Sequence, residues 1–279
     1  MTIDTNKLYF TDWPGSVLEV TGSDRATFLH NMCTADVKQM AVGESREAFF
    51  TNVKGHVLYH AVLHNAEDRV VVVVFTNDAG PLASQLDRYI IREEVELTQR
   101  KEQSVLVVGD DQQLADNCIK LPLGPPTMWL ALGDEVPSAL DTAGFVAGDA
   151  AAFAAVRVAA GWPQGGVEFG EATLPQELSR DSRAISFTKG CYLGQETIAR
   201  LDALGHVNKQ IVRVRALDGA QLAAGAQLTD GDKQVGTITT VGQIDNGYAG
   251  LAMVRRGSNA AGTQLTTDTG KVVVESLAE

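Results

Sequence analysis

The most informative stretch of this 279-residue chain is Lys189-Gly190-Cys191-Tyr192-Leu193-Gly194-Gln195-Glu196, and Thr197-Ile198-Ala199-Arg200 follows it. Two glycines flank the cysteine, which is typical of a tight turn or of backbone packed closely against a neighbour. We interpret the segment as a turn that enters a helix, with Glu196 near the positive end of the helix dipole. A cysteine at a helix N-terminus, with Lys189 two residues before it, meets two conditions for a lowered thiol pKa. Cys191 is therefore a candidate reactive thiolate, although these residues alone fit a buried, inert cysteine equally well.

The residues before this stretch alternate between strand-like and helix-like segments. Asp149 is a candidate N-cap and Gly161 a candidate end for one of the helices, and the run at 70–75 is typical of a strand buried on both faces. We expect strands at 17–20, 70–75, 105–108 and 128–132, a hairpin over 48–65 that turns at Asn52-Val53-Lys54-Gly55, and helices at 25–32, 81–91, 111–118 and 149–160. The second hundred residues loosely repeat this order, so a pseudo-duplicated body is expected, although no residue-level repeat supports it.

From about residue 204 the pattern changes to short strands at close spacing. The expected strands cover 211–216, 235–241, 247–253 and 271–276, and the turns between them contain Asp218-Gly219, Asp230-Gly231 and Asn246-Gly247. This pattern is typical of a small antiparallel barrel or sandwich. We therefore expect a body over 1–203, made of subdomains at about 1–100 and 101–203, and a separate β module over 204–279.

Composition narrows the class of protein. With 23 Lys and Arg against 35 Asp and Glu, the net charge is −12, which disfavours binding of nucleic acid or anionic membranes by bulk electrostatics. No apolar run approaches the roughly 20 residues that a membrane-spanning helix needs. The three cysteines, Cys33, Cys118 and Cys191, are too far apart for a disulfide framework or a metal knuckle. We expect a cytoplasmic protein without direct nucleic-acid contacts.

His56, His60 and His64 form the most tempting metal motif, because on a helix they would share one face. The surrounding residues favour a strand, where a step of four residues spans about 13 Å, too far for one metal ion. We therefore expect no metal site and interpret the three histidines as an outward or half-buried polar row on one strand face. Motifs of P-loop, dinucleotide-binding, serine-hydrolase and zinc-protease sites are absent from the sequence.

The stretch at 189–196 resembles the KGCYxGQE signature of the YgfZ-type folate-binding proteins, a branch of the superfamily that includes the glycine-cleavage T-protein. The matching signature residues are Lys189, Gly190, Cys191, Tyr192, Gly194, Gln195 and Glu196. Further similarity runs through Phe28-Leu29-His30, Thr34-Ala35-Asp36-Val37, Lys54-Gly55, Arg157, Gly161-Trp162-Pro163 and Pro175-Gln176-Glu177, so the resemblance covers essentially the whole chain.

This resemblance implies an α+β fold: a pseudo-duplicated α/β body around a central folate channel, followed by a C-terminal antiparallel β-barrel. It implies tetrahydrofolate or a one-carbon derivative as cofactor, with Cys191 as the catalytic group. The implied role is that of an accessory protein in iron–sulfur cluster assembly or repair and in the tRNA modification that depends on it. Iron–sulfur client or assembly proteins are the implied partners.

The resemblance also suggests folate contacts. Glu177 matches the glutamate that binds the pterin ring, and a carboxylate suits the paired N–H groups of that ring. Asn52 is a further candidate contact. Where the T-protein has an arginine for the folate tail, this chain has Gly205-His206, so Arg200 or His206 is the candidate there.

One departure from the T-protein concerns its chemistry. The T-protein carries an acid after the turn of the hairpin, whereas this chain reads Gly55-His56-Val57-Leu58-Tyr59-His60 without a carboxylate. That difference and the presence of Cys191 disfavour the alternative function, aminomethyltransferase-like one-carbon transfer. A folate-binding module without chemistry of its own is a third interpretation, and whether the protein is an enzyme stays open.

Overall fold

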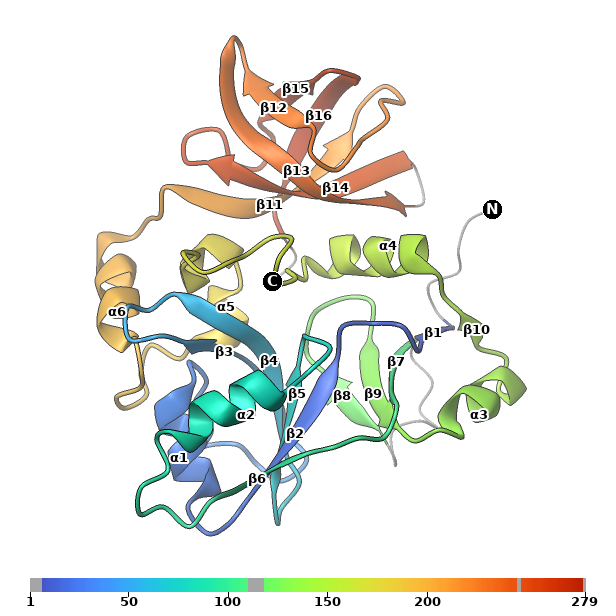
Figure 1. Ribbon diagram of the computed structural model, residues 1–279. Helices are drawn as coiled ribbons and strands as arrows, with labels where there is room; N and C mark the ends of the chain where they lie inside the picture. The colour runs from blue at the N-terminus through green and yellow to red at the C-terminus, as the bar shows by residue number, and fades with distance from the viewer. Residues whose placement is uncertain (1–6, 110–117, 245–246, 278–279) are drawn as a thin grey trace.

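Three β-sheets form the framework of the computed structural model, which describes residues 7–109, 118–244 and 247–277 (Figure 1). The first sheet has the strand order β3-β4-β5-β2-β6, with antiparallel neighbours throughout. Its strands are β2 (Ser16–Thr21), β3 (Ser45–Thr51), β4 (Val57–Asn65), β5 (Val70–Val74) and β6 (Glu96–Gln99). The helices α1 (Arg25–Met32) and α2 (Gly80–Asp87) pack against this sheet.

The central strand β5 shows why the first sheet is covered on both faces. All five of its valines are buried, as its unbroken apolar run predicts. Successive side chains of a strand point to opposite faces. Val71 and Val73 accordingly pack in the apolar cluster that includes the second sheet, and Val72 packs in the cluster that includes α1 and α2.

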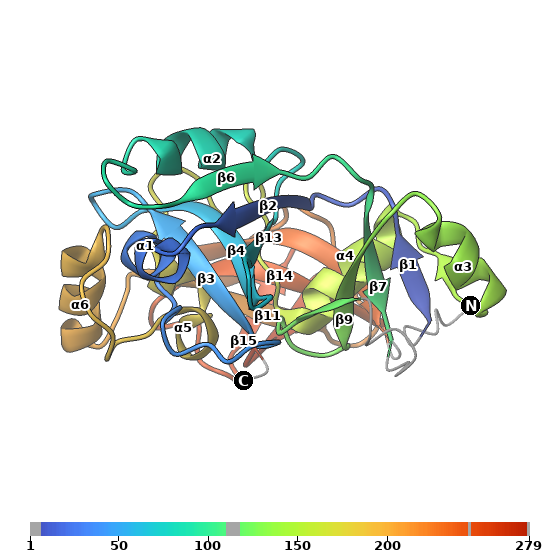
Figure 2. The same cartoon turned by 90° about the horizontal axis from the view of Figure 1, so that it is seen from below.

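The second sheet has the order β10-β1-β7-β9-β8, and only its pair of β1 with β10 is parallel among the described strands. Its strands are β1 (Leu8–Phe10), β7 (Ser104–Val108), β8 (Ile119–Leu121), β9 (Met128–Leu132) and β10 (Val146–Ala147), with α3 (Val136–Thr142) beside β10. Figure 2, seen from below, shows both sheets in front of the barrel. The expected pseudo-duplication stays a prediction.

The C-terminal strands close into a six-stranded antiparallel barrel with the order β11-β14-β13-β12-β15-β16. They are β11 (Lys209–Ala216), β12 (Gln227–Asp230), β13 (Lys233–Ile244), β14 (Gly247–Arg255), β15 (Gln264–Thr267) and β16 (Gly270–Glu275). The expected antiparallel barrel is thereby confirmed. The division of the chain at residue 204 and the two subdomains stay predictions.

The helix α4 (Ala150–Ala160) lies between the barrel and the sheets (Figure 1). Its ends follow the expected local signals: the Asp149 side chain accepts a hydrogen bond from Ala152 N, and Gly161 ends the helix at a φ of 61°. The barrel approaches α4 so closely that a Cβ on Gly242 would lie 2.6 Å from Ala155 Cα. α4 therefore fixes the barrel against the body.

One expected helix ends earlier than predicted, and another lies almost wholly outside the described residues. The helix expected at 81–91 is wrong at its C-terminal end, because α2 stops at Asp87 and the following residues make single-turn hydrogen bonds from Tyr89 N and Ile90 N. The helix expected at 111–118 lies outside the described residues apart from Cys118. Within the described part of the chain, no helix has the length and apolar character needed to cross a membrane.

Candidate functional site

Lys189, the first residue of the signature, is buried against the end of α1. Its Nζ donates hydrogen bonds to the carbonyl oxygens of His30 at 2.5 Å, Cys33 at 2.8 Å and Ala35 at 2.6 Å. The last carbonyls of a helix lack partners within the helix, and a cation satisfies them well. Burial lowers the pKa of this ammonium. The expectation that Lys189 activates the Cys191 thiol is therefore wrong, because its ammonium is held by α1 and the residues after it.

Gly194 anchors the other side of the signature against the β3–β4 turn. Its φ is +84°, and a Cβ there would lie 2.5 Å from the carbonyl oxygen of Asn52. Thr51 Oγ1 donates to the carbonyl oxygen of Leu193 at 2.7 Å, and Leu193 N donates to the carbonyl oxygen of Asn31 at 3.0 Å. The signature is thus bound both to α1 and to the turn of the hairpin.

Cys191 lies exposed between these two anchors. The helix α6 (Gln195–Leu204) begins four residues after it, with Gly194 as N-cap and Glu196 in the first turn. The expected helix is confirmed, but the placement of the cysteine at its N-terminus is wrong, because the tight turn at Gly194 separates them. Cys191 is accessible to solvent, whereas the next residue, Tyr192, is buried.

We predict that alkylation by iodoacetamide labels Cys191 at least about tenfold faster than Cys33 in the native protein. Cys33 is buried and burial raises its thiol pKa, while burial raises the pKa of Cys118 to about 11. Both therefore carry less thiolate near neutral pH than an ordinary cysteine. Peptide mass spectrometry after limited treatment measures the order, with urea-unfolded protein as control. Equal labelling of the three cysteines in the native state would contradict the prediction.

The other two cysteines lie outside the described helices and strands. Cys33 is the residue that caps the C-terminus of α1, and Cys118 directly precedes β8. Neither lies on the apolar face of a described helix, yet Cys33 is fully buried and Cys118 is partly buried. Tertiary packing, rather than helix periodicity, removes them from solvent.

Glu177 is a buried carboxylate on the short 3-10 helix η2 (Pro175–Leu178). Its Oε2 accepts a hydrogen bond from Leu174 N at 3.2 Å and lies 4.0 Å from Lys209 Nζ. Burial raises the pKa of Glu177, and the Leu174 hydrogen bond, Lys209 and His56 oppose that shift. Gln176 Nε2 donates to the carbonyl oxygen of Ile198 at 2.8 Å, which ties η2 to α6. Glu177 therefore lies close to the helix that follows the signature.

The remaining expected folate contacts differ in their surroundings. Asn52 Oδ1 accepts hydrogen bonds from Lys54 N at 2.9 Å and His56 N at 3.1 Å, so it builds the turn that supports Gly194. Arg200 is exposed on α6. His206 is exposed beyond it and its Nδ1 lies 2.8 Å from the carbonyl oxygen of Leu204. The structure brings Asn52 to the signature and leaves Arg200 and His206 at the surface of the α6 region.

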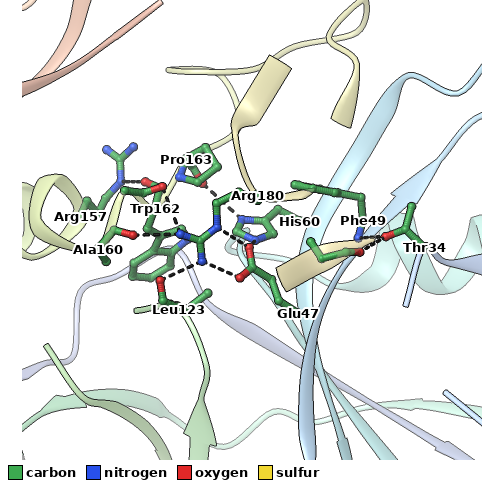
Figure 3. A network of polar contacts seen from close by, with 12 residues as sticks. Thr34, Glu47, Phe49, His60, Leu123, Arg157, Ala160, Trp162, Pro163 and Arg180 are labelled. Atoms are coloured by element: carbon green, nitrogen blue, oxygen red, sulfur yellow. Dashed lines mark hydrogen bonds and ion pairs between the residues drawn. The ribbon is translucent and has the colours of Figure 1, made fainter. Parts of the chain in front are cut away.

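His60 belongs to a fully buried charged network that the sequence did not reveal (Figure 3). Its Nε2 lies 2.7 Å from Glu47 Oε1, and Arg180 binds both oxygens of Glu47 at 2.7 and 2.5 Å. The expected outward or half-buried histidine row is therefore wrong at His60. His60 is buried because Glu47 and Arg180 provide charged partners beside its ring. His56, which precedes β4, and His64 are both half-buried, and Ser45 Oγ lies 3.0 Å from His64 Nδ1.

A second buried network joins α4 to the barrel. Arg157 forms an ion pair with Glu168, and its Nη1 donates to Thr240 Oγ1 at 3.2 Å. Thr240 Oγ1 in turn donates to Glu168 Oε1 at 2.6 Å. Glu168 and Thr240 were not among the predicted site residues. The one local signal for this network was Arg157, an arginine within the otherwise apolar helix pattern at 149–160.

A cavity of about 250 Å³ lies at the start of β4, next to the first network. Its wall includes Tyr59, His60, Phe75, Asn77, Gln164 and Phe169. Phe169 also packs in the apolar cluster that contains Leu178, the neighbour of Glu177. Aromatic rings and side-chain amides on one wall suit a flat, polar-edged ligand. In the described ranges, no three His, Cys, Asp or Glu side chains gather as a metal site.

Comparison with known proteins agrees with this architecture. Residues 208–277 match the family described as CAF17, C-terminal beta-barrel domain. The chain is 29% identical over 231 residues to the human iron-sulfur cluster assembly factor IBA57, mitochondrial, covering 73% of this chain and 65% of that protein. It is 24% identical over 274 residues to the tRNA-modifying protein YgfZ of Shigella dysenteriae, covering 87% and 83%. An uncharacterized protein of Haemophilus influenzae is 26% identical over 237 residues, covering 82% of each chain.

Among solved structures, the glycine cleavage system aminomethyltransferase T of Bartonella henselae superposes with a TM-score of 0.81 at 19% identity, covering 98% of this chain and 86% of that one. The chain therefore has the same fold as that aminomethyltransferase. The chain is similar to the YgfZ-type proteins in its signature at 189–196, and to YgfZ and IBA57 along most of its length.

Proposed function

We propose that this protein is a tetrahydrofolate-binding accessory protein of iron–sulfur cluster assembly or repair, and of the tRNA modification that depends on it. The observation that carries the proposal is the display of Cys191 on a loop that Lys189 and Gly194 anchor from both sides. The names of two relatives, an iron-sulfur cluster assembly factor and a tRNA-modifying protein, support the same role. Iron–sulfur client or assembly proteins are the proposed partners.

The chemistry of the site supports tetrahydrofolate, or a one-carbon derivative, as the cofactor. Tyr59, Phe75 and Phe169 offer aromatic surfaces to a flat ring, and Asn77 and Gln164 offer amide groups to its polar edge. Glu177 is a buried acceptor whose Oε2 accepts a hydrogen bond from Leu174 N. We propose that Glu177 binds the pterin N–H groups, with Asn52 nearby and Arg200 or His206 at the folate tail. When bound, the folate supplies a carrier for one-carbon units.

Aminomethyltransferase-like transfer remains the alternative function, and the cavity disfavours it. Tyr59 and His60 occupy the positions after the hairpin turn, and the cavity wall carries no carboxylate among the described residues. Glu47 lies behind His60 and is held by Arg180. An assay of glycine cleavage with the purified protein tests this alternative, and measurable turnover would support it.

The folate and cysteine roles are separable by mutation. In Glu177→Gln, we expect affinity for tetrahydrofolate and folinic acid to fall about ten- to a hundredfold, because a lost charged hydrogen bond to a buried donor costs about 1.5–3 kcal/mol. Glu171→Gln is the matched control, since Glu171 is exposed in the preceding loop. Calorimetric titration measures both, and an unchanged affinity in Glu177→Gln would remove Glu177 from the folate site.

In Cys191→Ser, by contrast, we expect folate affinity and stability to change little, since the substitution removes little volume from an exposed site. Cells that lack the wild-type gene should regain iron–sulfur enzyme activity and thiolated tRNA with the wild-type protein and not with Cys191→Ser. Full rescue by Cys191→Ser would contradict the proposed function even if the protein binds folate.

A further inference from the structure

One apolar cluster connects the wall of the cavity at the start of β4 to the neighbour of Cys191. Phe169 lines the cavity and packs in this cluster with Leu178, the residue after Glu177. The cluster also contains Tyr192, the residue after Cys191. Protein interiors are close-packed, so the side chains of one cluster cannot move far independently of each other. The cavity wall and the Cys191 loop therefore share one packed unit.

Gln176 adds a directed contact to this packing. Only 5% of its surface is exposed, and its Nε2 donates to the carbonyl oxygen of Ile198 at 2.8 Å. Ile198 lies in α6 and packs in the same apolar cluster. Apolar packing is non-directional, whereas a hydrogen bond fixes two groups in both distance and direction. Gln176 therefore sets the position of η2 relative to the helix that follows the signature.

The same helix is joined to the Cys191 loop at its first turn. Gln195 N, at the start of α6, donates to the carbonyl oxygen of Tyr192 at 3.2 Å. At the other end, Glu177 directly follows Gln176 in η2. A continuous series of contacts thus runs from Glu177 through Gln176 and α6 to the loop that carries Cys191.

We propose that Gln176 is a positioning residue that couples the proposed folate site to the Cys191 loop. Because Gln176 joins η2 to α6, a restraint on Glu177 also restrains the helix next to the loop. Coupling between two sites is reciprocal in binding free energy, so a group on the Cys191 sulfur must in turn change the affinity at Glu177. The inference rests on the proposed function for the place of the ligand, and it adds that occupancy of this place controls Cys191.

The first test uses no folate. Methyl NMR spectra of protein with labelled leucine and isoleucine are recorded before and after iodoacetamide treatment that labels only Cys191. In the wild-type protein we expect the signals of Ile198 and Leu178 to shift, although Leu178 lies in η2 and not in the loop. In Gln176→Met, a volume-conserving substitution that packed interiors tolerate, the Leu178 shift should become smaller. An unmoved Leu178 signal in the wild-type protein would overturn the proposal, however well the variant folds.

Gln210→Met is the matched control, because Gln210 also bonds to η2. Its Nε2 donates to the carbonyl oxygen of Gln176 at 3.4 Å, and its Oε1 accepts from Asn259 Nδ2 at 2.9 Å. These described hydrogen bonds join it to η2 and to the loop before β15, not to α6. Gln210→Met should therefore keep the wild-type shift of Leu178. An equal reduction in Gln210→Met and Gln176→Met would show a general loosening of η2 and would overturn the proposal.

The second test adds folinic acid and follows the alkylation rate of Cys191 by peptide mass spectrometry. At saturation we expect the rate to fall about fivefold in the wild-type protein and less than about twofold in Gln176→Met. Calorimetric titration should also show weaker folinic acid binding after Cys191 of the wild-type protein has been alkylated.

The outcomes of the second test separate the two proposals. An unchanged alkylation rate at measured saturation would overturn the coupling. Equal slowing in the wild-type protein and in Gln176→Met would mean that the ligand covers the sulfur itself, and would overturn it as well. Absence of folinic acid binding would count against the proposed function instead, and the NMR comparison would then decide the coupling alone.

Discussion

Glu47→Gln is expected to lower the free energy of unfolding by about 3–5 kcal/mol, because it leaves the Arg180 cation buried without a counter-charge. Glu47, His60 and Arg180 are each only 1% exposed. The carboxylate accepts from Arg180 at 2.7 and 2.5 Å and lies 2.7 Å from His60 Nε2 (Figure 3). Urea denaturation of the two proteins at pH 7 measures the loss.

The pH dependence of stability gives the same network a second readout. Burial alone would raise the pKa of Glu47, but Arg180 and His60 outweigh it and hold the pKa below its ordinary value. A carboxyl group with a lowered pKa in the folded state stabilises fully above its unfolded pKa of about 4.3 and loses that contribution as the pH falls further. Glu47→Gln should therefore remove part of the acid-induced loss of stability below about pH 4.

The control for Glu47→Gln is Glu102→Gln at the surface. Glu102 is 44% exposed and lies 2.5 Å from Arg100, so its geometry is comparable while its solvation is not. An exposed ion pair contributes about 0–1 kcal/mol. The double variant Glu47→Leu/Arg180→Met, which removes both charges, should lose less stability than Glu47→Gln. Equal losses in Glu47→Gln and Glu102→Gln would show that the buried charge is compensated in another way.

Features fixed by neighbouring residues could be predicted from the sequence. Asp149 caps α4 and Gly161 ends it through contacts within a few residues, and the valine run of β5 needs burial on both faces wherever it lies. The barrel followed from closely spaced strands and turns for the same reason. By contrast, β10 has two residues and β6 four, three of them exposed, so long-range pairing rather than local pattern makes them strands.

The site could be predicted only in part, for a related reason. The signature identified Cys191, but the role of Lys189 depends on a carbonyl oxygen of His30, which is 159 positions away in the sequence. Arg180 lies 133 positions from Glu47, and nothing in the sequence around either residue indicates that they meet. Charges buried by tertiary contacts leave no local pattern, so residue spacing suggested an outward or half-buried histidine row and an activating lysine instead.

Gly194→Ala is expected to lower the free energy of unfolding by about 2–5 kcal/mol, which combines two separate effects. Its φ of +84° disfavours any L side chain by about 1–2 kcal/mol. In addition, the new Cβ would lie 2.5 Å from the carbonyl oxygen of Asn52 and 2.7 Å from Thr51 Oγ1, and such overpacking costs about 1–3 kcal/mol. Urea denaturation measures the total.

Gly43→Ala separates the two effects, because Gly43 has a φ of +83° and nothing within 4 Å of the position of its Cβ. It should show only the backbone cost, about 1–2 kcal/mol. The difference between the two variants then measures how tightly the β3–β4 turn is held against the signature. If both variants lose the same stability, the β3–β4 turn shifts away from the new Cβ without any further loss of unfolding free energy. The contact at Gly194 then does not fix the loop that carries Cys191. A larger loss in Gly194→Ala, together with a changed rate of Cys191 alkylation, would show that this glycine holds the loop that carries Cys191 in place.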